Sequence, residues 1–220
     1  MLPQSAADRA AVDAALAGRL HGGPLVVIHP GTSEFAAFKR WVPERYAAVA
    51  DGLIAGRGAD VLVTYGPADR DVAAEVVAHM DVRGALARSA LAPPTGSLLQ
   101  YCELLRRAAL FIGSDTGPMH IASALGVPTV ALFGPKDPVQ TGPYCSRSIV
   151  VRGQADCAPC TRRRCSHVRC MTSITAEQVL AAAMDVLDGK GECRADAGLP
   201  PALLTAAGVG STGVPPGQTE

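Results

Sequence analysis

The segment 110–133, LFIGSDTGPMHIASALGVPTVALF, decides the fold of this chain. Its two ends, 110–113 and 128–133, are short apolar runs of the kind that form buried parallel strands. Between them, 118–125 is expected to form a helix, because Pro118 suits a first helical turn. A strand, a helix and a second strand in this order predict two parallel strands joined by a helical crossover.

The same alternation extends toward the N-terminus. Apolar runs at 25–28, at 60–65 and, more weakly, at 86–91 predict strands, and the segments 43–55, 68–79 and 97–109 predict helices. After Gly134 the sequence consists of turn residues, cysteines and basic residues up to Thr172, and a last amphipathic helix is expected over 175–187. Together these elements predict an α/β fold with a Rossmann-like parallel sheet.

The composition is that of an ordinary globular protein. Of the 220 residues 48% are hydrophobic, and 20 Lys and Arg residues balance 20 Asp and Glu residues. A formal net charge of zero argues against broad binding to nucleic acids. No apolar run reaches the ~20 residues of a membrane span, and Asp8, Arg9 and Asp13 stand where a signal peptide needs apolar residues. We therefore expect a cytoplasmic protein without a transmembrane segment, which could act at the inner face of the membrane.

Three parts are expected along the chain. Residues 1–23 predict a lead-in helix, or the remnant of a preceding domain, because Ala, Val and Leu recur there at helical spacing. Residues 24–190 form the predicted α/β domain. Residues 191–220 are rich in Gly, Pro, Ala and Thr without any period, which predicts a disordered tail.

The turn after the strand 110–113 carries the strongest chemical signal. A buried parallel strand brings the chain to the sheet edge where α/β proteins bind ligands. The free amides of the next helix, with the positive end of its dipole, form an anion site. Gly117 lets a phosphate approach the backbone there, the Thr116 hydroxyl can donate to it, and His120 lies on the same turn. Asp115 either belongs to this site or only caps the helix.

A second set of polar residues follows the first strand. Thr32 and Ser33 lie at its carboxyl end, where hydroxyl groups can reach phosphate oxygens, and Lys39 can neutralise a diphosphate. The alternative is that Lys39 and Arg40 are solvated surface charges. A third turn, FGPKDP at 133–138, lies at the same predicted edge but indicates no chemistry by itself.

Three sequences follow one another along the chain: VVIHPGTS at 26–33, KRWVPERY at 39–46 and DTGPMHIASALGVPTVALFGPKDP at 115–138. In this order and spacing they resemble glycosyltransferase family 9, the ADP-heptose:lipopolysaccharide heptosyltransferases. The resemblance covers Pro24 to Leu187. It implies the C-terminal half of a GT-B fold, in which a second Rossmann-like domain binds a nucleotide-sugar donor. The implied reaction transfers a heptose or a related sugar from an ADP-sugar to a lipopolysaccharide core or a similar glycan.

The resemblance also implies roles for single residues. The donor-binding residues that it implies are Thr32, Ser33, Lys39, Asp115, Thr116, Gly117 and His120. Asp69 or Asp71 is expected to meet the ribose. In this family the general base lies in an acceptor-binding domain, and only 23 residues precede Pro24 here. No catalytic residue is therefore expected in this chain, and a separate acceptor domain is an expected partner.

Four of the seven cysteines form the pattern C-x2-C-x4-C-x4-C at Cys157, Cys160, Cys165 and Cys170. Four soft ligands at this spacing can close a tetrahedral site for a structural zinc ion or, less commonly, hold an iron–sulfur cluster. Such clustering suits a reducing compartment better than a set of disulfides. The alternative is a loop of reduced thiols. The arginines at 162–164 are expected either to be solvated or to face an anionic acceptor.

Three functions are compatible with these features. A sugar transferase would stabilise a leaving diphosphate with helix amides and Lys39, and it is expected to need no cofactor for catalysis. A non-catalytic nucleotide-sugar-binding module, or half of a split enzyme, would use the same site. A metal-binding or redox module would act through 157–170 instead.

Overall fold

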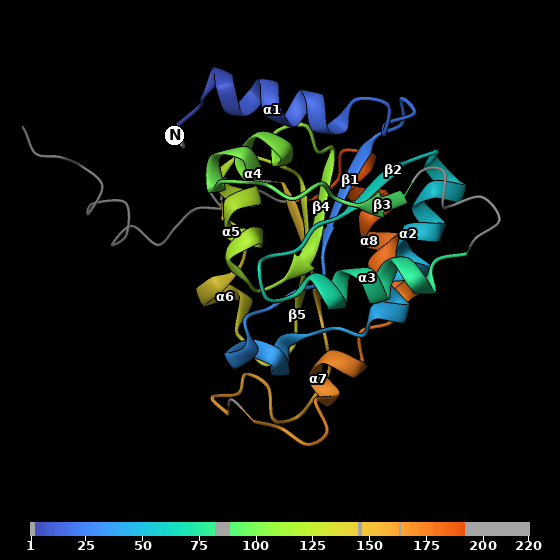
Figure 1. Cartoon of the computed structure of the whole chain (residues 1–220). Coiled ribbons are helices and arrows are strands. Elements are labelled where there is room, and N and C mark those ends of the chain that lie inside the picture. The colour runs from blue at the N-terminus through green and yellow to red at the C-terminus, as the bar shows by residue number, and fades with distance from the viewer. Residues whose placement is uncertain (1–2, 82–88, 145–146, 163, 192–220) are drawn as a thin grey trace, which may run out of the picture.

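A single sheet of parallel strands forms the centre of the molecule (Figure 1). The computed structural model describes residues 3–81, 89–144, 147–162 and 164–191. Within them the strands are β1 (Leu25–His29), β2 (Asp60–Val63), β3 (Ser89–Leu91), β4 (Leu110–Ser114), β5 (Thr129–Phe133) and β6 (Ser148–Arg152). They lie in the order β3-β2-β1-β4-β5-β6, and all neighbours are parallel. This is the strand order of the Rossmann fold, which confirms the predicted fold class.

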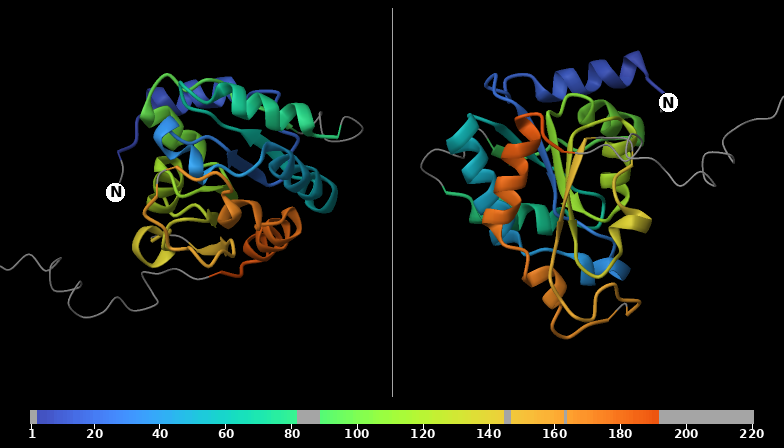
Figure 2. Two further views of the ribbon diagram at one scale, coloured as in Figure 1. Left: turned by 90° about the horizontal axis from the view of Figure 1, so that it is seen from below. Right: turned by 180° about the vertical axis from the view of Figure 1, so that it is seen from behind.

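Helices cover both faces of the sheet (Figure 2). One face carries α2 (Pro43–Arg57), α3 (Arg70–His79) and α8 (Ala176–Leu187), and the other carries α1 (Ala6–Leu16), α4 (Leu98–Leu105) and α5 (Gly117–Ala124). Three short helical segments complete the described elements: η1 (Glu34–Lys39), α6 (Pro138–Thr141) and α7 (Arg169–Thr172). Because the central strands bury side chains on both sides, one hydrophobic core forms on each face.

The ends of several elements follow from local chemistry. β1, β2, β4 and β5 are buried along their whole length, as their apolar sequences predict. α2 ends where Gly58 adopts a left-handed conformation with a φ of 59°. α8 begins with a capping box, in which the side chains of Thr175 and Gln178 accept each other's backbone N–H groups.

Four elements, η1, α6, β6 and α7, are not predicted by the sequence pattern, and the last three lie in the segment where the sequence indicates turns. β6 is an edge strand whose residues are half-buried or exposed, and its short sequence SIVVR stands among turn residues and cysteines. η1 is a 3-10 helix broken by a kink at Ala36, so it lacks helical periodicity. The other expected strands and helices are present with shifted ends, and residues 86–88 of the weak strand lie outside the described residues.

The helix α1 packs against the same body as the sheet. Val12 and Leu16 are buried in the core that α4 and α5 share, and Arg107 Nη2 donates to Asp13 Oδ1 at 2.5 Å. The division of the chain at residue 24 stays a prediction. Of the tail expected over 191–220, all but Gly191 lies outside the described residues. Among the helices that are described, none is both long and apolar enough to cross a membrane.

The loops after β1 and β4 meet at a switch point of the sheet. These strands are neighbours, but β1 leads to β2 on one side while β4 leads to β5 on the other. A switch of this kind opens a crevice beyond the carboxyl ends of the two strands. The fold therefore places the polar residues of both loops around one crevice.

Candidate functional site

A polar cleft of about 550 Å³ lies at the switch point. Its walls come from the loop after β1 with η1, from the loop after β2 and from the start of α5. All the donor-binding residues expected from the sequence line it: Thr32, Ser33, Lys39, Asp115, Thr116, Gly117 and His120. The structure thus brings these residues together, and their part in binding a donor stays a prediction.

Asp115 is the centre of a charge network in this cleft. It is 7% exposed, and its carboxylate accepts a hydrogen bond from Lys39 Nζ at 2.6 Å. Lys39 Nζ also donates to the Asp115 carbonyl at 3.1 Å. On the other side, His120 Nε2 lies 3.4 Å from Asp115 Oδ1. Lys39 is therefore not a solvated charge, and Asp115 does not cap α5, whose N-cap residue is Thr116.

Arg40 fixes the loop that forms the neighbouring wall. Its Nε donates to Thr32 Oγ1 and its Nη2 to the Thr32 carbonyl, both at 3.0 Å. The Thr32 hydroxyl in turn donates to the Ser33 carbonyl at 3.2 Å, so this hydroxyl already has a donor and an acceptor. Ser33 is exposed at the start of η1 and offers the more accessible hydroxyl.

The start of α5 has the form of an anion site. Thr116 precedes the helix in an extended conformation, and Pro118 occupies the first turn. A Cβ added at Gly117 would meet no atom within 4 Å, so the backbone is open to the cleft at this residue. The unpaired amides of a first turn and the helix dipole attract an anion at such a position.

His29 and Asp69 form the floor of the cleft. His29 is 5% exposed, with Nδ1 3.0 Å from Thr64 Oγ1 and Nε2 3.5 Å from Asp69 Oδ2. Asp69 also accepts a hydrogen bond from the Gly66 amide at 2.6 Å. Burial tends to raise the pKa of Asp69, but the hydrogen bond and charge of His29 and the Gly66 amide outweigh burial and hold the pKa below its ordinary value. His29 was not predicted as a site residue, although it is the last residue of β1 and therefore lies, like Thr32, at the carboxyl edge of the sheet.

Gly31 is required by the contact between the loops after β1 and β2. A Cβ at this position would lie 1.6 Å from Asp69 Oδ2, and only glycine allows this approach. Asp69 and Asp71 have the D-x-D spacing, but Asp71 is exposed in the first turn of α3. Of these two candidates for the ribose, only Asp69 lines the cleft.

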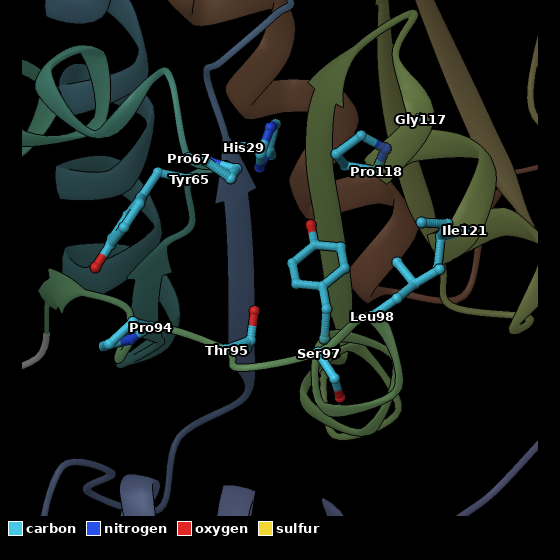
Figure 3. A pocket seen from close by; sticks show the side chains of 12 residues that line it. His29, Tyr65, Pro67, Pro94, Thr95, Ser97, Leu98, Gly117, Pro118 and Ile121 are labelled. Atoms are coloured by element: carbon cyan, nitrogen blue, oxygen red, sulfur yellow. The ribbon is translucent and has the colours of Figure 1, made fainter.

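An apolar cavity of about 520 Å³ adjoins the polar cleft (Figure 3). Tyr65 and Pro94 lie on one side of it, and Pro118 and Ile121 of α5 lie on the other (Figure 3). The two hollows share residues at their boundary, among them His29 and Pro118. A ligand with a charged part and a flat apolar part could therefore occupy both hollows at once.

The four cysteines of the 157–170 loop lie in one region but do not form a closed metal site. Cys170 is buried in α7, Cys160 is half-buried, and Cys157 and Cys165 are exposed. Burial raises the pKa of the Cys170 thiol, and the negative charges of the other three thiolates raise it further. Backbone amides donate to the sulfurs of Cys160 and Cys165, each at 3.4 Å. No three of these described sulfurs lie within 4.8 Å of one another.

The strand order and the position of the cleft define the class of this chain, a Rossmann-like α/β domain with a polar cleft at its switch point. The family model of glycosyltransferase family 9 (heptosyltransferase) matches residues 2–170. The chain belongs to this family.

The relatives that this chain matches are named as heptosyltransferases, and they are longer than this chain. Lipooligosaccharide heptosyltransferase 2 of Campylobacter jejuni is 29% identical over 171 residues, which cover 76% of this chain and 52% of the relative. Lipopolysaccharide heptosyltransferase 1 of Pseudomonas aeruginosa is 32% identical over 167 residues, covering 76% and 44%. The solved ADP-heptose lps heptosyltransferase II of E. coli superposes with a TM-score of 0.68 at 25% identity, covering 86% of this chain and 54% of that one. The chain thus spans about half the length of these relatives.

Proposed function

We propose that this chain is the donor-binding half of a heptosyltransferase and holds an ADP-sugar with the diphosphate in the polar cleft. The observation that carries this proposal is the network of Lys39, Asp115 and His120 at the start of α5, beside an apolar cavity. Membership in family 9 and the match to half of each heptosyltransferase relative support it.

The diphosphate is assigned to the groups that can still donate hydrogen bonds. A lysine ammonium has three N–H donors, and the carboxylate and carbonyl of Asp115 engage Lys39 Nζ twice. The third donor can bind a phosphate oxygen. The amides at the start of α5 add further donors at the same place. As the bond between sugar and diphosphate breaks, negative charge grows on the departing phosphate, and these groups stabilise that charge.

The nucleoside is assigned to the neighbouring cavity. Its lining of Tyr65, Pro94 and Ile121 suits a flat apolar base. Asp69 lines the polar cleft beside His29, which lines both hollows, and it is ionised near neutral pH because its pKa is lowered. A carboxylate accepts hydrogen bonds from a vicinal diol, so Asp69 is our candidate for the ribose.

In the proposed reaction an acceptor hydroxyl attacks the anomeric carbon of the sugar. The C–O bond to the diphosphate breaks, its electron pair stays on the phosphate oxygen, and the hydroxyl proton passes to a base. We assign that base to a separate acceptor-binding domain and none of the residues of this cleft to its role. We assign the reaction to the cytoplasm, at the inner face of the membrane, with a lipopolysaccharide core or a similar glycan as acceptor.

Calorimetric titration of the chain tests the donor assignment. We expect ADP and ADP-heptose to bind more tightly than UDP-sugars and GDP-sugars. Lys39→Ala should weaken ADP binding by about 1.5–3 kcal/mol, the range for a hydrogen bond to a charged group. Arg70→Ala is the control, since Arg70 is exposed and lies outside the cleft lining. Failure of every nucleotide to bind would overturn the function.

Assays of sugar transfer separate the transferase from a non-catalytic module. We expect no transfer by the chain alone and transfer once an acceptor-binding domain from the same organism is added. Transfer by the chain alone would show that the base lies within it. A donor complex that no added domain can turn over would favour the binding module.

We also propose that the 157–170 loop can hold one structural zinc ion, whose binding would have to draw together sulfurs that are apart in the described structure. Thiolates are preferred zinc ligands, and the amides that donate to Cys160 and Cys165 stabilise the charged sulfurs. The Cys160 amide donates to the Pro135 carbonyl at 2.7 Å, so the loop supports the turn after β5. Elemental analysis should find about one zinc per chain and less in Cys160→Ser. Metal-free protein with an unchanged melting temperature would favour reduced thiols.

A further inference from the structure

η1 separates two hollows at the carboxyl edge of the sheet. On one side, Ala36 and Lys39 line the polar cleft. On the other side, Phe35 and Phe38 line an open groove of about 730 Å³, which we call the η1 groove. Its opposite wall comes from the cysteine-rich loop, at Arg164, Cys165 and Val168. The loop and η1 lie beside each other in the views of Figures 1 and 2.

The wall formed by η1 is aromatic and accessible. Phe35 is 83% exposed, and Phe38 is half-buried. Of the η1 side chains that line the groove, Glu34 has polar atoms, and Phe35, Ala37 and Phe38 are apolar. Exposing a large apolar ring to water costs free energy, and such a ring beside a hollow is typical of a binding surface. The C–H face of a sugar ring matches the face of an aromatic ring in size and polarity.

The opposite wall is basic. Between Cys157 and Cys170 the sequence contains four arginines and one histidine but no acidic residue, in a chain whose formal net charge is zero. Arg164 lines the groove, and its guanidinium has no hydrogen bond or ion pair to another described residue. A guanidinium presents donors in a planar fork that fits a carboxylate or a phosphate.

From these observations we infer that the η1 groove binds an anionic saccharide, a sugar that carries a carboxylate or a phosphate. A ring of the saccharide would stack on Phe35, and its anionic group would pair with Arg164. Because η1 also carries Lys39, the groove lies next to the donor cleft, and the saccharide would be part of the glycan acceptor. This inference rests on the proposed function.

Titration of the full chain with deacylated lipopolysaccharide core oligosaccharide, followed by NMR, tests the inference. We expect Arg164→Ala and Phe35→Ala each to weaken oligosaccharide binding about fivefold or more, as loss of a charged hydrogen bond or an aromatic contact predicts. Arg19→Ala and Val139→Ala are the matched controls, because both residues are exposed and lie outside the groove. ADP affinity should stay within about twofold in all four variants.

The other outcomes either overturn the inference or separate it from the proposed donor site. Equal binding of the oligosaccharide by wild type and both groove variants, or no binding at all, would overturn the inference. So would equally tight binding of dextran sulfate, which indicates a non-specific polyanion surface. Cosedimentation with phosphatidylglycerol vesicles that Arg164→Ala abolishes, without oligosaccharide binding, would assign the surface to a membrane instead. If the oligosaccharide binds through the groove but no nucleotide binds, the groove stands and the proposed donor site fails.

Discussion

Substitution of Gly117 by alanine should separate stability from donor binding. Gly117 is the first residue of α5, and a Cβ there would meet no atom within 4 Å. Alanine loses less backbone entropy than glycine in a helix, by about 0.5–1 kcal/mol. For a domain of this size 1 kcal/mol corresponds to roughly 2–4 °C. We therefore expect the melting temperature of Gly117→Ala to be unchanged or up to about 4 °C higher.

Donor binding should change in the opposite direction. The space that the added methyl group would fill is where the diphosphate is proposed to approach the amides of α5. Loss of one hydrogen bond between an amide and a phosphate costs about 1.5–3 kcal/mol, which corresponds to a roughly ten- to 150-fold weaker affinity for ADP. Adenosine lacks the phosphates and is the control ligand, and its affinity should stay within about twofold.

Calorimetric titration and thermal unfolding measure the two effects in the same samples. An ADP affinity that is unchanged in a stable Gly117→Ala variant would contradict the reasoning, because the anion would then not approach this backbone. An equal loss of ADP and adenosine binding would mean that the methyl group blocks the nucleoside instead. A large drop in the melting temperature would show that the fold cannot accommodate the added methyl group at this residue. The backbone of Gly117 would then not be open to the cleft.

Three further predictions concern the floor of the cleft and the thiols. Gly31→Ala should destabilise the fold by about 2–4 kcal/mol in urea unfolding, since Asp69 must give up its contacts with Gly66 and His29; unchanged stability would contradict the close approach. Because the pKa of Asp69 is lowered from 3.8, its contribution is fully present above that value and is lost as the pH falls through the lower native pKa. Urea unfolding of Asp69→Asn between pH 7 and 3 should therefore show a flatter acid limb than wild type. In protein treated with a chelator, iodoacetamide should modify Cys165, whose pKa is lowered, before the buried Cys170, whose pKa is raised, as peptide mass spectrometry can follow.

Much of the fold could be predicted because the central strands are continuous apolar runs. β1, β4 and β5 are buried on both faces, and their sequences contain few polar residues to confuse the pattern. β6 was not predicted because it is an edge strand, which is stabilised by pairing with β5 more than by burial of its own side chains. η1 was not predicted because a short, kinked 3-10 helix has no periodic pattern of apolar residues in its sequence.

The candidate site could be predicted as a set of residues but not as a network. The rule that parallel strands gather their carboxyl ends at one edge was enough to bring Lys39 and His120 into one cleft. The pairing of Lys39 with Asp115 spans 76 positions, and that of His29 with Asp69 depends on how closely two loops approach at Gly31. Such distances depend on the packing of the whole sheet. The hydrogen bonds from Arg40 to Thr32 could not be predicted for the same reason, because they form only in the folded loop.

The charge balance of the cleft bears on which phosphates it can select. Two buried carboxylates, Asp115 and Asp69, lie where an anion is proposed to bind, but Lys39 pairs with the first, and His29 and the Gly66 amide pair with the second. Paired carboxylates repel an anion less, yet they also consume most of the positive charge that would attract one. A small free phosphate then gains little beyond the amides of α5. In the proposed complex a nucleoside diphosphate would also occupy the apolar cavity beside the cleft, and burial of its base there would supply affinity that the balanced charges do not.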